Sequence, residues 1–185
     1  HRALFVRRPA RDGVNMNEIV NILDSMEYGP APEEDGHIRA WLKRHDGRFG
    51  QFIDGKLTKG GKETFEVRNP ADGEKLADVA EAGEKEVDAA VKAATSAFAR
   101  WSGLSGTERA RHLYAIARQV QKHARFLAVL ESMDNGKPIR ETRDIDIPLV
   151  ARHFYHHAGW AELRDEEFPD HVPAGVCGQI IPWNF

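Results

Sequence analysis

Cysteine and long apolar runs are nearly absent from this 185-residue sequence. Its single cysteine, Cys177, excludes an internal disulfide framework. No apolar stretch approaches the roughly 18 residues that a membrane-spanning helix needs, and the start of the chain has no apolar signal segment. These absences predict a protein of the reducing cytoplasm that does not contact a membrane.

Positive charge is also scarce, since 26 Lys and Arg face 29 Asp and Glu and leave a net charge of −3. A nucleic-acid-binding face needs clustered Lys and Arg to displace counterions, so no nucleic-acid partner is expected. Residues 1–15 are the exception, with four Arg against one Asp. We interpret them as a disordered tail, or as sequence upstream of a start at Met16.

Two short helices are predicted between Met16 and about Arg44. The first has apolar residues at helical spacing, which are Ile19, Ile22, Leu23 and Met26. Residues 28–32 then contain two prolines, which interrupt the pattern because proline fixes φ and removes a hydrogen-bond donor. The second helix spans about residues 37–44. We therefore expect residues 16–50 to form a short helical N-terminal extension, too small to bury a core alone.

Short strands are expected next, at residues 52–57, 64–68 and 76–80. Turn-forming sequences separate them, at residues 59–62 and 69–73. Gly60 and Gly61 are assigned to a hairpin turn, because Lys62 lacks the spacing of a phosphate-binding loop.

Amphipathic helices follow. The first carries one apolar face that ends near Trp101 and consists of Val87, Ala90, Val91, Ala94 and Phe98. Ser105 and Glu108 fit a capping box that begins a second helical stretch, interrupted near His123. Gly136 and Pro138 end this stretch, since glycine supplies a left-handed cap and proline prevents continuation. A third helix is expected at about residues 146–163.

The last segment, residues 172–181, is apolar and β-branched, which is typical of a strand buried on both faces of a parallel sheet. Strands, then amphipathic helices, then a buried strand predict an α/β fold. The chain reaches residue 185 where that strand would present its carboxyl end, the edge at which open α/β sheets bind ligands.

Motifs in residues 52–185 resemble the aldehyde dehydrogenase family in order and spacing. They are Phe-Ile-Asp-Gly at 52–55, Asn-Pro-Ala-Asp-Gly at 69–73, Glu-Arg at 108–109, Asp-Asn-Gly-Lys-Pro at 134–138, Ala-Gly-Trp at 158–160 and Gly-Gln-Ile-Ile-Pro-Trp-Asn-Phe at 178–185. The extension, with Met-Glu-Tyr-Gly-Pro-Ala-Pro at 26–32, is most similar to family 16 of that superfamily. The resemblance implies that residues 51–185 are the truncated N-terminal part of a Rossmann-like NAD(P)-binding domain, incomplete in this chain.

The resemblance also implies a reaction, in which a cysteine thiolate attacks an aldehyde and hydride passes to NAD or NADP. A water molecule activated by glutamate then releases the carboxylic acid. Asn184 matches the residue that donates its amide N–H to the oxyanion. Ile181, Pro182 and Trp183 match the segment along the cofactor, and Phe185 matches an aromatic wall of the aldehyde tunnel.

In the family the nucleophile lies far downstream of these residues, so the chain alone is expected to be inactive. The resemblance separately implies that the full-length enzyme is a homo-oligomer. A non-catalytic scaffold that retains the fold is the alternative. From the last four residues alone, a turn that caps a strand is the favoured explanation of Asn184, and the run of upstream motifs reverses that preference.

Other residues could suggest chemistry, but a plainer explanation is preferred for each. Cys177 has apolar neighbours and is therefore expected to be buried. Burial in apolar surroundings makes a thiol unreactive, so Cys177 is not expected to be the nucleophile. His153 and His157 share a helical face, but no Cys or carboxylate pattern completes a metal site, so none is predicted. The acidic residues in 162–167 are assigned to a solvated surface.

Overall fold

The computed structural model describes residues 16–25 and 32–182. The chain divides into two compact units, residues 1–32 and residues 33–185. In the first unit, α1 (Met16–Ser25) confirms the predicted first helix. The predictions for the tail of residues 1–15 and for Met26 lie outside the described residues.

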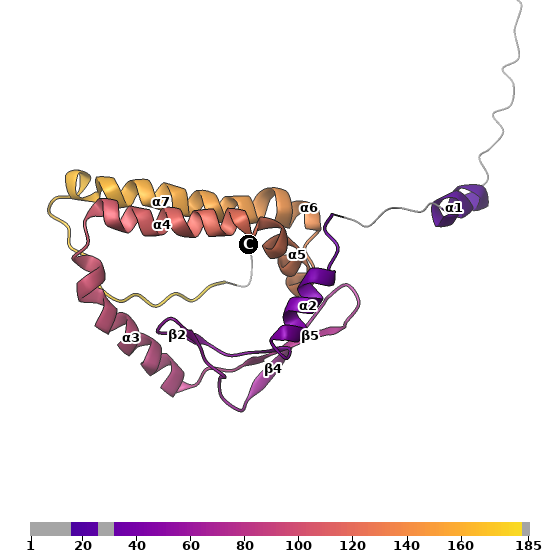
Figure 1. Cartoon of the computed structure of the whole chain (residues 1–185), viewed down its shortest axis with the longest axis horizontal. Helices are drawn as coiled ribbons and strands as arrows, with labels where there is room; N and C mark the ends of the chain where they lie inside the picture. Colours follow the sequence, from indigo (N-terminus) through magenta and orange to yellow (C-terminus); the bar gives the residue numbers. More distant parts are fainter. Residues whose placement is uncertain (1–15, 26–31, 183–185) are drawn as a thin grey trace, which may run out of the picture. The chain divides into compact units, whose positions relative to one another are not determined.

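The second unit contains the sheet and the longer helices (Figure 1). Its elements are, in chain order, α2 (Gly36–Arg44), β1 (Arg48–Phe49), β2 (Phe52–Ile53), β3 (Lys56–Leu57), β4 (Thr64–Arg68), β5 (Lys75–Ala80), α3 (Glu84–Ser102), α4 (Gly106–Lys122), α5 (Ala124–Asn135), α6 (Ile139–Glu141), the π-helical η1 (Thr142–Asp146) and α7 (Ile147–Glu167). Strands and helices together confirm an α/β fold. No described helix is long and apolar enough to cross a membrane.

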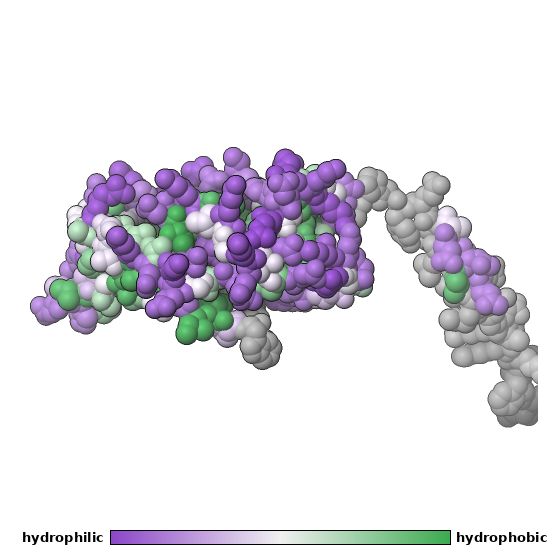
Figure 2. All heavy atoms as spheres, turned by 90° about the horizontal axis from the view of Figure 1, so that it is seen from below, coloured by the Kyte–Doolittle hydropathy of each residue, from purple (hydrophilic) through white to green (hydrophobic). Residues whose placement is uncertain are grey.

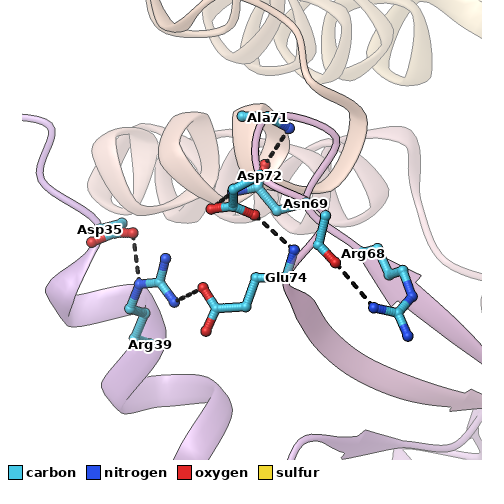
Figure 3. A network of polar contacts seen from close by, with 8 residues as sticks. Asp35, Arg39, Arg68, Asn69, Ala71, Asp72 and Glu74 are labelled. Atoms are coloured by element: carbon cyan, nitrogen blue, oxygen red, sulfur yellow. Dashed lines mark hydrogen bonds and ion pairs between the residues drawn. The ribbon is translucent and has the colours of Figure 1, made fainter.

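The main sheet has the strand order β1-β5-β4, with β4 antiparallel and β1 parallel to β5. The turn between β4 and β5 is held by its own side chains (Figure 3). The Asn69 Oδ1 atom accepts from the Ala71 N–H at 3.1 Å, and the Asp72 Oδ1 atom accepts from the Glu74 N–H at 2.8 Å. Gly73 has a φ of 75°, which glycine adopts without strain. The predicted turn at residues 69–73 is confirmed.

The single strand predicted at residues 52–57 is wrong, because the structure has a tight hairpin there. Phe52 of β2 pairs with Leu57 of β3 in an antiparallel register. Asp54 and Gly55 have φ values of 51° and 73°. An Asp-Gly pair in left-handed conformation reverses the chain, which separates the predicted strand into two halves.

Helix α2 packs into the core of the second unit. Ile38 is fully buried, and with Leu42 it joins Leu76, Val129 and Met133 in one apolar cluster. Ion pairs add to this contact, since the Arg39 guanidinium reaches Asp35 at 2.7 Å and Glu74 at 2.6 Å (Figure 3). The sequence predicts that residues 16–50 form one short helical extension. In the structure, α2 instead packs against the sheet and α5.

Helices α4 and α7 lie side by side in antiparallel directions (Figure 1). Their approach at one end needs a glycine, because a Cβ atom on Gly106 would lie 2.4 Å from the Ala161 carbonyl oxygen. The predicted capping box begins α4. The Ser105 Oγ atom accepts from the Glu108 N–H at 3.2 Å, and Glu108 accepts from the Ser105 N–H at 2.9 Å. The Ser105 N–H, and after it the Ser105 hydroxyl at 2.8 Å, donate to the Glu108 carboxylate and lower its pKa.

The predicted helix ending near Trp101 is confirmed as α3, but its apolar face is not covered. Val87 and Val91 are 54% and 50% exposed, and α3 buries none of its residues. Figure 2, which views the molecule from below, shows apolar side chains at the surface between charged ones. Helices of globular proteins are stabilised mainly by burying such a face, so α3 has an unused packing surface.

The buried strand predicted at residues 172–181 is wrong for this structure, in which the chain has no regular secondary structure from residue 168 to 182. Val172 and Ile180 are 88% and 98% exposed. A strand exists only where a neighbour accepts its backbone hydrogen bonds, and no described strand lies beside this segment. Cys177 is exposed for the same reason, so its expected burial is also wrong.

Replacing Ile38 by Ala tests whether α2 is part of the core. The change removes fully buried methylene and methyl groups, so the free energy of unfolding should fall by about 2–5 kcal/mol. Val87→Ala removes comparable groups from an exposed helical position and should change it by less than about 0.5 kcal/mol. Chemical denaturation followed by circular dichroism measures both. Equal effects of the two substitutions would contradict the packing of α2.

Candidate functional site

Two of the five residues expected at the site, Ile181 and Pro182, line a cavity of about 730 Å³. Its other described lining residues come from the end of α5, from η1 and from α7; they are Glu131, Asn135, Gly136, Lys137, Asp146, Leu149, Val150 and His153. Trp183, Asn184 and Phe185 lie outside the described residues. The cavity therefore lies where the chain leads into the remaining predicted site residues.

The polar wall of the cavity is built by the end of α5. Gly136 follows the helix with a φ of 78°, and its N–H donates to the Ser132 carbonyl at 3.0 Å. The Asn135 side chain accepts from the Lys137 N–H at 2.8 Å and donates to Glu131 at 2.7 Å. The predicted helix stop at this glycine is confirmed, and it determines where the Lys137 backbone lies.

The same cap is packed tightly against the sheet. A Cβ atom on Gly136 would lie 3.0 Å from the Pro70 Cβ atom in the turn between β4 and β5. Contacts at this distance are tighter than those that real Cβ atoms normally make. Gly136 is thus required for two reasons, its left-handed backbone and the closeness of Pro70.

A second part of the lining begins in the π-helical segment η1, which precedes α7 and was not predicted. The buried Thr142 hydroxyl lies 3.0 Å from the Ala128 carbonyl oxygen and 3.0 Å from the Ser132 hydroxyl. These bonds hold η1 against α5. Short π-helical segments occur often at functional sites, where they change the direction of the following side chains. Here η1 ends at Asp146, on the wall of the cavity.

Lys137 and Asp146 join the two walls by an ion pair, with 2.5 Å between Nζ and Oδ2. The Lys137 side chain is 26% exposed and the Asp146 side chain 12%. The second carboxylate oxygen of Asp146 is buried and has no hydrogen-bond partner among the described residues. Such a pair is costly to disrupt, because removing one partner leaves the other charge largely desolvated.

Apart from His153, the remaining described lining is apolar, and it contains no cysteine, serine or threonine. Leu149 and Val150 of α7 face the cavity together with Ile181 and Pro182, and Ile181 is exposed. The thiol of Cys177 is not among the lining residues; its Sγ atom lies 3.7 Å from the Gly175 carbonyl oxygen. The cavity can therefore hold a flat or aliphatic group and orient its polar end. Its apolar side chains have no group that could form a covalent bond to a substrate.

The other candidate residues lie at the surface. His153, His156 and His157 are exposed, and the His156 Nε2 atom accepts from the Trp160 indole N–H at 3.1 Å. No group of three potential metal ligands is found among the described residues. Glu162, Asp165, Glu166 and Glu167 are exposed, as predicted for a solvated surface.

Sequence reasoning missed Lys137 and Asp146 as cavity residues. In the sequence, Lys137 belongs to the motif at residues 134–138, and Asp146 marks the start of a predicted helix. The sequence does contain a hint of this ion pair. Lys137 directly follows the helix cap and Asp146 lies nine residues later, so the two opposite charges stand on either side of a break between helices. Their pairing depends on η1, whose irregular geometry has no clear sequence pattern.

A second cavity, of about 310 Å³, lies in the core and contains none of the expected site residues. Its lining is mainly apolar and includes Trp41, Phe49, Leu76, Leu127 and Ile147. Because it is bounded by the side chains that join α2, the sheet and α5, we regard it as imperfect core packing and not as the functional site.

Comparison with known proteins identifies the family. The aldehyde dehydrogenase family matches residues 57–185 of the chain. An aldehyde dehydrogenase from Bacillus cereus, solved as its NAD+ complex, is 37% identical over 73% of this chain and 27% of its own, with a TM-score of 0.63. A mutant of the Bacillus cereus enzyme is 34% identical over 86% of this chain and 29% of its own, with a TM-score of 0.64.

HpcC from Thermus thermophilus is 37% identical over 68% of this chain and 25% of its own, with a TM-score of 0.62. The chain thus spans about a quarter of the length of these relatives.

Replacing Gly136 by Ala should destabilise the cap that positions the cavity. Alanine is strained at positive φ and its Cβ atom would press on Pro70, so the free energy of unfolding should fall by more than about 1 kcal/mol. Gly159→Ala is the matched control, because Gly159 is inside α7 with open space around it. That change should raise stability by about 0.5–1 kcal/mol. Thermal denaturation of both variants measures the difference, and a stabilising Gly136→Ala would refute the proposed cap.

Proposed function

Because the chain belongs to the aldehyde dehydrogenase family, we propose that a full-length protein containing it oxidises an aldehyde to a carboxylic acid with NAD or NADP. The observation that carries this proposal is the cavity of about 730 Å³ at Ile181 and Pro182. A relative of 37% identity is described as an NAD+ complex, which supports NAD as the cofactor.

The residues of the cavity fit a nicotinamide cofactor and a small aldehyde. Its size is within the range of ligand pockets, about 300–1,000 Å³, and its lining combines apolar side chains with a few polar groups. Ile181 is exposed and so can contact a ring. We assign Ile181, Pro182 and Trp183 to the cofactor and Phe185 to the wall of the aldehyde site.

In the proposed reaction, the nucleophilic cysteine is assigned to sequence outside this chain, because Cys177 is not at the cavity. The general base is assigned there too, from the resemblance to the family. The bound cofactor supplies an acceptor for the hydride of the aldehyde. This chain supplies Asn184, whose side-chain N–H groups stabilise the negative charge on the oxygen of the tetrahedral adduct. The ion pair of Lys137 and Asp146 holds α5 and η1 at the separation that leaves space for the substrate.

The exposed apolar segment is part of the same proposal. We infer that residues 172–181, which form no strand in this structure, pack against the remaining sequence of the family fold. The exposed Val172 and Ile180, and the open face of α3, are surfaces that such packing would cover. On this basis residues 51–185 are the N-terminal part of the NAD(P)-binding domain, and the chain alone should be inactive.

Three finer assignments rest on the sequence. The similarity of residues 26–32 to family 16 supports membership of that branch. The single cysteine supports a cytoplasmic location. A homo-oligomer is proposed from the resemblance to the family.

Asn184→Ala tests the proposed chemistry in the full-length protein. Losing one preorganised oxyanion donor should lower kcat about 100- to 1000-fold, because the charge that it stabilises develops only in the transition state. KM for the aldehyde should change little. Steady-state NADH formation, followed by its absorbance with a range of aldehydes, gives both constants.

Gln179→Ala is the control, since Gln179 is close to Asn184 in the sequence, is exposed and has no assigned role. It should leave kcat within a few-fold of the parent protein. If the full-length protein oxidises no aldehyde, the scaffold alternative is favoured; if it is active and Asn184→Ala matches the control, the oxyanion role is wrong.

A further inference from the structure

We propose that the cavity at Ile181 and Pro182 discriminates against aldehydes that carry a carboxylate or phosphate, and accepts neutral and ammonium-bearing aldehydes. This inference rests on the proposed aldehyde dehydrogenase function. It goes further by naming the charge class of the substrate, which the family membership leaves open.

The charged side chains of the lining carry the argument. Lys137 is the one Lys or Arg among the described lining residues, and Asp146 already neutralises it at 2.5 Å. Glu131 is the other carboxylate of the lining, and it accepts from the neutral amide of Asn135 at 2.7 Å. The described wall therefore has a net negative charge and no cation available for an anionic substrate.

Lys137 cannot easily leave Asp146 to bind a substrate anion. Both side chains are largely buried, and Asp146 has a second oxygen that already lacks a partner. Moving the ammonium away would leave the whole carboxylate desolvated and unpaired, which is strongly unfavourable. The Lys137 backbone is also held, because its N–H donates to the Asn135 side chain in the cap of α5.

His153 is the remaining titratable lining residue. It lies on α7 and is exposed. Assays should therefore be run at a pH well above the range in which an ordinary histidine binds a proton, so that the carboxylates and Lys137 alone determine the charge of the wall.

The test compares three aldehydes of similar length on the full-length protein: butanal, 4-oxobutanoate and 4-(trimethylammonio)butanal. We expect kcat/KM for 4-oxobutanoate to be about tenfold or more below that for butanal, as for one uncompensated charge near a protein surface. The trimethylammonio aldehyde should match or exceed butanal. The ratio of kcat/KM values is the readout, because a general loss of structure lowers all three rates together.

Two substitutions change the charge of the wall at nearly constant shape. Asp146→Asn removes the negative charge that is paired with Lys137, and Glu131→Gln removes the charge of the other carboxylate. Each should raise the 4-oxobutanoate to butanal ratio about tenfold. Glu131→Gln keeps the test valid if Asp146→Asn fails to fold. Glu141→Gln is the control, since Glu141 is exposed on α6 and is not a lining residue, and it should leave the ratio unchanged.

Three results would overturn the inference. If the parent protein oxidises 4-oxobutanoate as well as butanal, the charge selection is wrong while the proposed function holds. If the parent discriminates but neither Glu131→Gln nor a folded Asp146→Asn changes the ratio, the selecting charge lies elsewhere. If none of the three aldehydes, nor a wider set, is oxidised, the proposed function fails and this inference fails with it.

Discussion

The left-handed backbone at Gly136 is the constraint on which most of the described site depends. It ends α5 against Pro70, so one residue fixes the helix relative to the turn between β4 and β5. The Asn135 side chain then holds the Lys137 backbone, and the ion pair with Asp146 places the start of α7 opposite. Without a sharp helix end at this position, Lys137 would not be placed to pair with Asp146 in the lining of the cavity.

The unit of residues 33–185 combines well-formed local structure with incomplete burial. Helices α4, α5 and α7 pack on one another, and α2 completes a small core with the sheet. By contrast, α3 and residues 168–182 expose apolar side chains that elsewhere in proteins are covered. The relatives are about four times longer than the stretch they share with this chain, and we propose that the shared fold supplies the cover.

Electrostatics and shape have different roles in the cavity. The apolar side chains of α7 and of Ile181 give it room for a ligand, but they are compatible with many aldehydes. The pairing of Lys137 with Asp146 removes the one described cation from use and leaves Glu131 to determine the sign of the wall. Charge specificity would therefore arise from which carboxylate is already neutralised, and not from the number of charged residues.

Features that depend on local chemistry could be predicted from the residues alone. The capping box at Ser105, the turn at residues 69–73 and the helix end at Gly136 were predictable, because each satisfies backbone groups within a few residues. The motifs of residues 52–185 also indicated the family and directed attention to Ile181 and Pro182. Tertiary structure decided what depends on distant partners: the burial of Ile38, the exposure of Cys177, the unpaired segment 172–181 and the pairing of Lys137 with Asp146. An apolar or charged pattern indicates that a side chain needs burial or an opposite charge. Whether that burial or charge is present depends on how the rest of the chain packs around the side chain.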